Sequence, residues 1–169
     1  GQSRVRNQSR HGAGCVVDDD TDHYPSGAIH MALGDQGYVG LVRRGDGLLN
    51  LAGAFDREAL SQGQGAVDAA QKVLNQAGFP LPPALQQGQR WQLTPALSRN
   101  SNVVAGERFL VMGDAAGYVE PFTGEGMAWA LTAGAAAAPF VLEGQEQWSG
   151  DLETRWKTTL QVHIGRRQT

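Results

Sequence analysis

The sequence predicts a mixed α/β fold in which an antiparallel meander and one helix precede a strand, a glycine-rich loop and two further helices. Three observations support this fold class. Short apolar runs alternate with Gly/Asp turns over residues 28–55, as in antiparallel sheets. Apolar residues then recur at helical spacing between Gly65 and Gly78. Finally, the apolar run 109–112 leads through several glycines into the alanine-rich stretch 124–138, which favours a helix.

The bulk composition suits a globular protein and excludes several classes of function. The 169 residues are 41% hydrophobic and 18% charged, with a net charge of −3 and no basic stripe, so we expect no nucleic-acid partner. Neither a signal peptide nor an apolar run long enough to cross a bilayer is apparent, so no transmembrane segment is predicted. The one cysteine, Cys15, is predicted to be a packed small side chain, and the absence of a second cysteine indicates a reducing, cytoplasmic compartment.

The first 27 residues are polar and rich in turn formers, and Val16-Val17 is expected to form at most a short strand. An acidic run in this segment resembles the start of a calcium loop, but the sixth position is His23 rather than glycine and the twelfth is Ile29 rather than glutamate. We therefore predict a solvated turn and no metal site. The acidic residues of the run are Asp18, Asp19, Asp20 and Asp22.

Three strands are expected over 28–33, 38–44 and 48–55, joined by turns that contain glycine and aspartate. His30 lies in the middle of the first strand. It could face a ligand, but the preferred interpretation is a histidine whose hydrogen bonds are satisfied within the sheet. A helix should begin after Gly65 and end at Gly78, since a proline follows two residues later.

The second half of the chain is predicted to contain a Pro- and Gln-rich connection with one candidate strand near 91–93, followed by a buried strand over 107–112. A helix over 124–138 should be ended or kinked by Pro139. A final helix over 151–164 would carry apolar residues at i, i+4 spacing on one face. These residues are Leu152, Trp156, Leu160 and Ile164.

The loop between the last strand and the helix has the residues of a ligand site. Gly113 would let the backbone approach a ligand, and Asp114 would accept hydrogen bonds from hydroxyl groups at the carboxyl end of the strand. Pro121 stiffens the loop, and a helix that starts within 124–127 presents backbone N–H groups without intrahelical partners. Such a helix start suits an anion or the electron-rich edge of a ring.

These residues carry a resemblance to a known family. The stretch "RFLVMGDAAGYVEPFTGEGMAWALTAG" resembles the second FAD-contacting motif of the flavoproteins that include aromatic-ring monooxygenases, flavin-dependent halogenases and geranylgeranyl reductases. The resemblance implies that Asp114 holds the ribityl chain, that the Pro-x-x-Gly-x-Gly turn packs beside the isoalloxazine ring, and that the N–H groups near Met127 face its pyrimidine edge. The implied FAD-binding residues are Gly113, Asp114, Ala115, Pro121, Gly124, Glu125, Gly126 and Met127.

A second match lies at the start of the chain, where "SRVR" (residues 3–6) resembles the tail of the family's Asp-Gly-x-x-Ser-x-Val-Arg motif. The family's N-terminal strand–GxGxxG–helix is missing, and "GAGCVVD" at Gly12 lacks the flanking strand and helix that this motif needs. The resemblance thus implies the C-terminal portion of a two-domain, glutathione-reductase-like Rossmann flavoprotein whose N-terminal half is absent. Residues 1–27 would end one FAD-domain segment, 28–104 would form the substrate-side antiparallel sheet with one helix, and 105–169 would return to the FAD domain.

The resemblance implies an FAD-dependent oxidoreductase that acts on a small-molecule substrate, with NAD(P)H as a candidate electron donor and with no activity expected of this segment alone. The family's halogenases and reductases carry Trp-containing motifs in the sheet, whereas "GYVGLVRR" keeps Tyr38 but has Gly40 in place of the tryptophan. A monooxygenase-like or reductase-like enzyme is therefore expected. An apolar or aromatic substrate is suggested by the sheet residues Val39, Leu41, Leu49 and Leu51, for which plain core is the preferred interpretation.

No catalytic residue is assigned from the sequence. Glu125 is the one tempting acid, and the preferred interpretation is that it stabilises the helix dipole. Two other functions stay open: a non-catalytic module that binds a nucleotide or anion at the helix start, and a flavoprotein remnant that cannot bind FAD alone.

Overall fold

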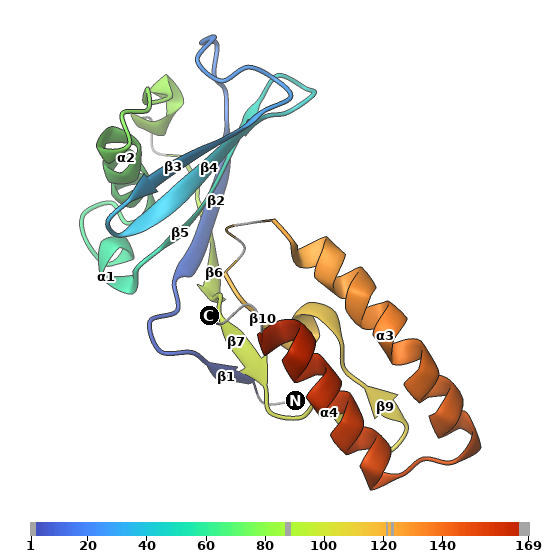
Figure 1. Cartoon of the computed structure of the whole chain (residues 1–169). Helices are drawn as coiled ribbons and strands as arrows, with labels where there is room; N and C mark the ends of the chain where they lie inside the picture. The colour runs from blue at the N-terminus through green and yellow to red at the C-terminus, as the bar shows by residue number, and fades with distance from the viewer. Residues whose placement is uncertain (1–2, 87–88, 121, 123, 166–169) are drawn as a thin grey trace. The chain divides into compact units, whose positions relative to one another are not determined.

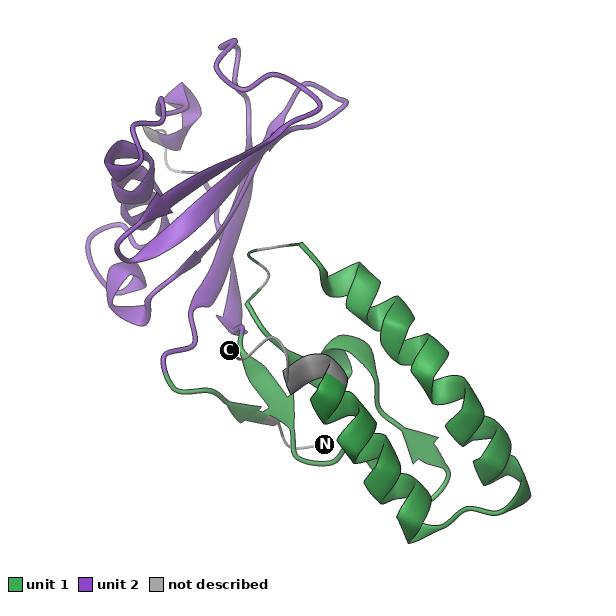
Figure 2. Ribbon diagram, viewed as in Figure 1, with its two compact units in different colours: residues 1–7, 98–169 green, residues 8–97 purple. Residues whose placement is uncertain are grey.

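The computed structural model describes residues 3–86, 89–120, 122 and 124–165 and divides into two compact units (Figure 2). Unit 1 comprises Gly1–Asn7 and Ser98–Thr169, and unit 2 comprises Gln8–Leu97. The chain therefore passes between the units after residues 7 and 97, whereas the sequence boundaries were expected after 27 and 104. Both units mix strands and helices, and their sheets are antiparallel, which confirms the predicted α/β class at this level.

Unit 2 is built on a five-stranded antiparallel sheet with the strand order β3-β4-β5-β2-β6 (Figure 1). Three short helical segments belong to the same unit, and α2 contacts both β3 and β4. The predicted meander, the helix after Gly65 and the strand near 91–93 are all confirmed. The elements are β2 (His11–Val17), β3 (Ile29–Gly34), β4 (Gly37–Arg43), β5 (Leu49–Phe55), α1 (Arg57–Leu60), α2 (Ala66–Gln76), the 3-10 turn η1 (Pro83–Gln86) and β6 (Gln92–Ala96).

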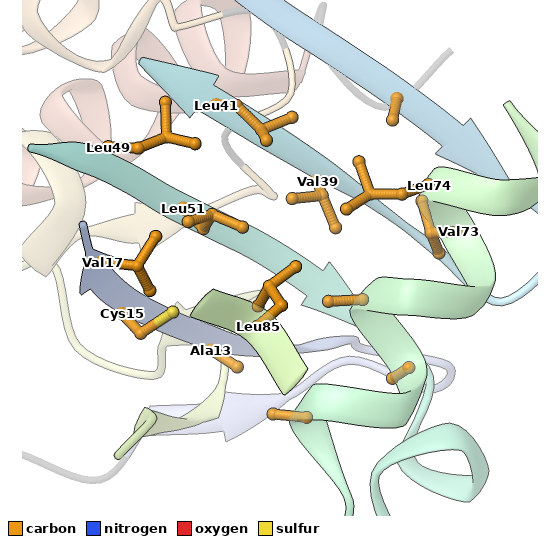
Figure 3. Close-up of a cluster of buried hydrophobic side chains, with 14 of the residues drawn as sticks. Ala13, Cys15, Val17, Val39, Leu41, Leu49, Leu51, Val73, Leu74 and Leu85 are labelled. Atoms are coloured by element: carbon orange, nitrogen blue, oxygen red, sulfur yellow. The ribbon is translucent and has the colours of Figure 1, made fainter. Parts of the chain in front are cut away.

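The core of unit 2 fills the layer between one face of this sheet and its helices (Figure 3). Val39, Leu41, Leu49 and Leu51 are fully buried there. Burial of side chains of this size contributes roughly 1.5–3 kcal/mol each. The core side chains labelled in the figure are Ala13, Cys15, Val17, Val39, Leu41, Leu49, Leu51, Val73, Leu74 and Leu85.

The prediction of at most a short strand at Val16-Val17 was wrong. Strand β2 has seven residues and pairs with both β5 and β6. The glycines of this segment suggested a turn. They alternate along β2 with its core residues and therefore lie on the other face of the sheet. A Cβ at Gly14 would come within 3.1 Å of the Leu51 carbonyl oxygen. Cys15 is confirmed as a packed side chain, and burial raises the pKa of its thiol to about 11.

The turn between β3 and β4 depends on one glycine. Gly34 pairs with Gly37 across the two-residue loop Asp35-Gln36. Gly37 has φ +152°, and a Cβ placed on it would overlap the carbonyl oxygen of Ala54 on β5. Only glycine combines this backbone conformation with so close a strand approach.

We expect Gly37→Ala to destabilise the protein by at least about 2 kcal/mol, because the added methyl group must displace backbone. Gly45→Ala is the matched control, since Gly45 lies in the next hairpin loop and a Cβ placed on it would have nothing within 4 Å. Urea denaturation of both variants measures the difference. Equal midpoints would show that the β3–β4 turn tolerates a side chain.

The acidic run is solvated at Asp18, Asp20 and Asp22, as predicted, but Asp19 is buried. Its carboxylate forms an ion pair with Arg43, with 2.5 Å between Oδ2 and Nη2. The Arg43 guanidinium also donates to the carbonyl oxygens of Asp19, Thr21, Tyr24 and Gly47. This side chain therefore ties the loop after β2 to the loop between β4 and β5. Within the described residues, no group of three or more His, Cys, Asp or Glu side chains is placed to hold a metal.

His30 also departs from its prediction. Its Nε2 atom is buried and has no hydrogen-bond partner in the described part of the chain, so it is not a satisfied sheet histidine. The imidazole instead packs edge-on against Tyr24, with 5.3 Å between ring centroids. Tyr24 is anchored in turn, since its hydroxyl donates to the carbonyl oxygen of Pro80.

Unit 1 contains two small antiparallel sheets and two long helices that pack on each other (Figure 1). Ala133 and Ala137 of α3 are buried with Trp156 and Leu160 of α4, and the Phe140 and Trp156 rings lie 5.4 Å apart. The elements are β1 (Ser3–Val5), β7 (Arg99–Ser101), β8 (Ala105–Gly106), β9 (Phe109–Leu110), the 3-10 turn η2 (Gly113–Ala115), β10 (Gly117–Tyr118), α3 (Gly126–Glu146) and α4 (Gly150–Gly165).

The strand and the helix end predicted for unit 1 differ from those of the structure. The buried strand over 107–112 is reduced to β9, which pairs only with β8 among the described residues, and Phe109 and Met112 are 47% and 37% exposed. A buried strand needs partners along its edges, and the described chain supplies one. Helix α3 continues through the exposed Pro139 to Glu146, so this proline does not end the helix.

Helix α3 also corrects the prediction that no run is long and apolar enough to cross a bilayer. By length and composition it meets that requirement, and 11% of its most apolar window is buried in the structure. Core helices of globular proteins pass the same test, so this is weak evidence for a membrane segment. Several large apolar side chains of α3 are exposed: Met127, Leu131, Val141 and Leu142.

Candidate functional site

The glycine-rich loop of unit 1 brings the Gly-Asp pair against helix α3. Gly113 has φ +58° at the start of η2, and a Cβ placed on it would lie 3.5 Å from the Ala130 Cβ. The small residues at both positions let the loop backbone approach the second turn of the helix. Asp114 and Ala115 then project from η2 as exposed residues. The carboxylate of Asp114 is thus available to a ligand beside the helix.

A second wall of the site comes from β10 and the residues after it. Burial raises the pKa of the Tyr118 hydroxyl, and the carboxylates of Asp114 and Glu120 raise it further. Strand β10, which carries Tyr118, contacts the η2 turn that carries Asp114. The Glu120 N–H donates to the Ser98 hydroxyl at 3.3 Å, and Ser98 is buried. Ser98 thus holds the end of the loop in place.

The start of α3 forms the open side of the site. Gly124 has φ +70°, and a Cβ placed on Gly124 or on Gly126 would have nothing within 4 Å. Glu125 is the N-cap residue, and its carbonyl accepts the Trp129 N–H at 3.1 Å. Met127 is 80% exposed. Backbone N–H groups of the first turn are therefore accessible to a flat or anionic ligand. Pro121, predicted to stiffen this loop, lies outside the described residues.

The arrangement offers two complementary kinds of contact. A carboxylate at Asp114 accepts hydrogen bonds from hydroxyl groups, while the N-terminus of α3 attracts negative charge. Contacts between η2 and α3 place Gly113 and Asp114 against the helix that begins near Gly124 and Gly126. That these four residues form one ligand site stays a prediction. Tyr118 and Ser98 were missed. Tyr118 lies inside the recognised motif, but nothing in the sequence indicates that Ser98 pairs with a residue 22 positions later.

The predicted substrate face does not line an open surface. Val39, Leu41, Leu49 and Leu51 are fully buried in the core of unit 2, so the preferred interpretation as core is confirmed. The neighbouring positions along the same strands point to the opposite face of the sheet.

Comparison with known proteins gives the fold. No protein-family model matches the sequence, and no curated protein matches it. The structure is similar to CmlS, a flavin-dependent halogenase, with a TM-score of 0.61 and 18% identity over 93% of this chain and 30% of that chain. The chain has the fold of part of a flavin-dependent halogenase.

Two further halogenase structures are similar to this chain over most of its length. Xcc4156 from Xanthomonas campestris has a TM-score of 0.68 and 8% identity, and the match covers 99% of this chain and 31% of that chain. A tryptophan halogenase from Shewanella frigidimarina has a TM-score of 0.64 and 12% identity, covering 94% of this chain and 29% of that one. The chain therefore spans about a third of the length of these halogenases, and at such low identity the likeness concerns the fold alone.

Proposed function

We propose that this chain forms part of an FAD-dependent oxidoreductase, in which the loop at Gly113–Ala115 and the start of α3 hold the flavin. The observation that carries the proposal is the pairing of an exposed carboxylate with an unobstructed helix N-terminus in one unit. The fold of the flavin-dependent halogenases supports the same assignment. Bound FAD would supply the redox chemistry.

The residues of the site have distinct roles in this proposal. Asp114 accepts hydrogen bonds from the ribityl hydroxyls, and Gly113 and Ala115 keep the backbone close to them. Gly124 and Gly126 lack side chains that would obstruct the flat ring. The N–H groups near Met127 stabilise negative charge at the edge of the reduced ring. Glu125 acts through the helix dipole, and Pro121 stiffens the loop.

The type of reaction that we favour depends on a tryptophan that the sheet lacks. Gly40 stands where related halogenases and reductases carry a tryptophan, so we favour a monooxygenase-like or reductase-like reaction on an apolar or aromatic molecule, with NAD(P)H as electron donor. We assign the flavin side to unit 1 and the substrate side to unit 2. The ADP half of the cofactor would be bound by a strand–GxGxxG–helix outside these 169 residues, in a cytoplasmic enzyme.

The test is the absorption spectrum of the purified full-length protein that contains this chain. We expect the visible bands of an oxidised flavin, with FAD released on denaturation. Reconstitution with added FAD covers loss of the cofactor during purification. If the folded protein neither retains nor takes up FAD, the oxidoreductase assignment fails and the non-catalytic anion-binding module becomes the better description.

A further inference from the structure

A pocket in unit 2 is lined by residues of the β3–β4 turn, of α1 and the loop after it, and of α2. Three of the lining side chains are apolar and buried, namely Ala59, Ala69 and Val73, and they form its floor. The pocket contains about 480 Å³ of empty space, including the part that is open to solvent. Small-molecule sites have volumes of about 300–1,000 Å³, so this pocket has the size of a site for a small ligand.

Hydrogen bonds connect the β3–β4 turn to both helices that line the pocket. The Gln76 side-chain amide forms two bonds with Asp35, accepting its backbone N–H at 3.1 Å and donating to its carboxylate at 3.0 Å. The Gln36 carbonyl oxygen accepts the backbone N–H of Asp56, the N-cap residue of α1, at 2.9 Å. The turn is therefore fixed against α1 and against α2.

Two opposite charges line the pocket without pairing with each other. Asp68 and Lys72 lie four residues apart on α2, a spacing at which an acid and a lysine attract each other along a helix. Here the Asp68 Oδ2 atom accepts the Gln64 N–H at 2.8 Å. The Lys72 ammonium donates instead to the Gln36 Oε1 atom at 2.7 Å. Within the described residues, neither charge takes part in an ion pair.

The position of the Asp68 carboxylate depends on a glycine. Gly63 has φ +52°, and a Cβ placed on it would overlap the Asp68 Oδ2 atom. A side chain at this position would therefore displace the carboxylate from the backbone N–H that holds it. An ammonium has three donors and a carboxylate has two oxygens, so Lys72 and Asp68 can each bind a ligand in addition to the partner that they already have.

The two charges restrict the kind of molecule that suits the pocket. A cation alone would be attracted by Asp68 and repelled by Lys72, and an anion alone would meet the reverse. A molecule with both an ammonium and a carboxylate group satisfies both charges at once through charge-assisted hydrogen bonds. The apolar floor complements a compact aliphatic group on the same molecule.

We propose that this pocket binds a small zwitterion, with its ammonium on Asp68, its carboxylate on Lys72 and an aliphatic group on the floor. An aliphatic amino acid is the simplest molecule of this class. The site uses none of the residues assigned to the flavin, so the inference goes beyond the proposed function and does not depend on it.

The first experiment compares three ligands of similar shape by isothermal titration calorimetry of the full-length protein. L-Valine carries both charged groups, isobutylamine carries only the ammonium, and isovalerate carries only the carboxylate. We expect L-valine to bind at least tenfold more tightly than either of the others, because it alone pairs with both Asp68 and Lys72. Equal affinities for the three ligands, or no binding of L-valine, would overturn the inference.

The second experiment assigns each charge of the ligand to its partner. Lys72→Met should lower the affinity for L-valine at least tenfold without lowering that for isobutylamine, which has no carboxylate. Asp68→Asn should lower the affinity for L-valine in the same way without lowering that for isovalerate, which has no ammonium. The asparagine oxygen still accepts the Gln64 N–H, so this variant keeps the hydrogen bond at the start of α2.

Lys157→Met is the matched control, because Lys157 is an exposed lysine of α4 that does not line this pocket. It should leave all three affinities unchanged. A loss of structure in unit 2 would lower the affinities for all three ligands together, so parallel losses in Lys72→Met and Asp68→Asn would overturn the assignment of the two charges. An equal loss of L-valine affinity in Lys72→Met and Lys157→Met would overturn the site itself.

Discussion

The Arg43→Met variant is expected to lose about 3–5 kcal/mol of unfolding free energy, because it leaves the Asp19 carboxylate as an uncompensated charge in the protein interior. The Asp19 side chain is fully buried and that of Arg43 is 14% exposed. The substitution also removes the donors to four backbone carbonyl groups that fix two loops of unit 2. Urea denaturation of the variant and the parent protein, followed by circular dichroism, measures the loss.

Arg44→Met is the control for this prediction. Arg44 forms an ion pair with Asp46 at 2.7 Å, but both side chains are nearly half exposed, so we expect a loss below about 1 kcal/mol. Adding Asp19→Asn to Arg43→Met should recover part of the stability, since no charge is then left buried. If Arg43→Met and Arg44→Met cost the same, the buried pair is not what holds these loops.

The Asp114→Ala variant is expected to bind FAD about 2–4 kcal/mol more weakly in the full-length protein, because one or two charge-assisted hydrogen bonds to the ribityl chain are lost. This corresponds to an affinity lower by a factor of about 30 to 1,000. The Asp114 side chain belongs to an exposed turn, so the folded protein should tolerate its truncation. Titration of the apoprotein with FAD, followed by quenching of flavin fluorescence, measures the affinity.

Glu107→Ala serves as the matched control, since Glu107 is another exposed acid of unit 1 outside the loop. It should leave FAD affinity unchanged, which separates the role of Asp114 from a general loss of negative charge. Asp114→Asn should fall between the parent and Asp114→Ala, because the amide oxygen still accepts a hydrogen bond without the charge. An Asp114→Ala variant with parental affinity would rule out the ribityl contact.

Much of the fold could be predicted because its signals are local. The Gly/Asp turns set the limits of β3, β4 and β5 to within one residue, since turn conformations restrict the residues that can adopt them. Gly65 and Gly78 bracket α2 for the same reason. The flavin-site hypothesis was equally local: the glycines, the aspartate and the helix start fall within 15 consecutive residues, 113–127.

Tertiary structure alone decided which face of the sheet is the core. Most residues on both faces of β4 and β5 are apolar or small. Alternation along the strand therefore separates the two faces but does not indicate which of them is buried. The helices of unit 2 bury Val39 and Leu41, whereas Gly40, between them in the strand, lies on the opposite face of the sheet. The glycines of β2 likewise suggested a turn, but β2 pairs with β5 on one side and β6 on the other, and a Cβ on Gly14 would crowd the Leu51 carbonyl oxygen.

The sequence by itself therefore determined the turns, the amphipathic helix and the chemical character of the loop at Gly113–Met127, because each depends on the conformational preferences of neighbouring residues. The tertiary structure decided the burial of Asp19 by Arg43 and the shortening of the strand at 107–112 to β9. These features depend on partners that are distant in the chain. The local sequence of a segment does not indicate which distant segment will pack against it.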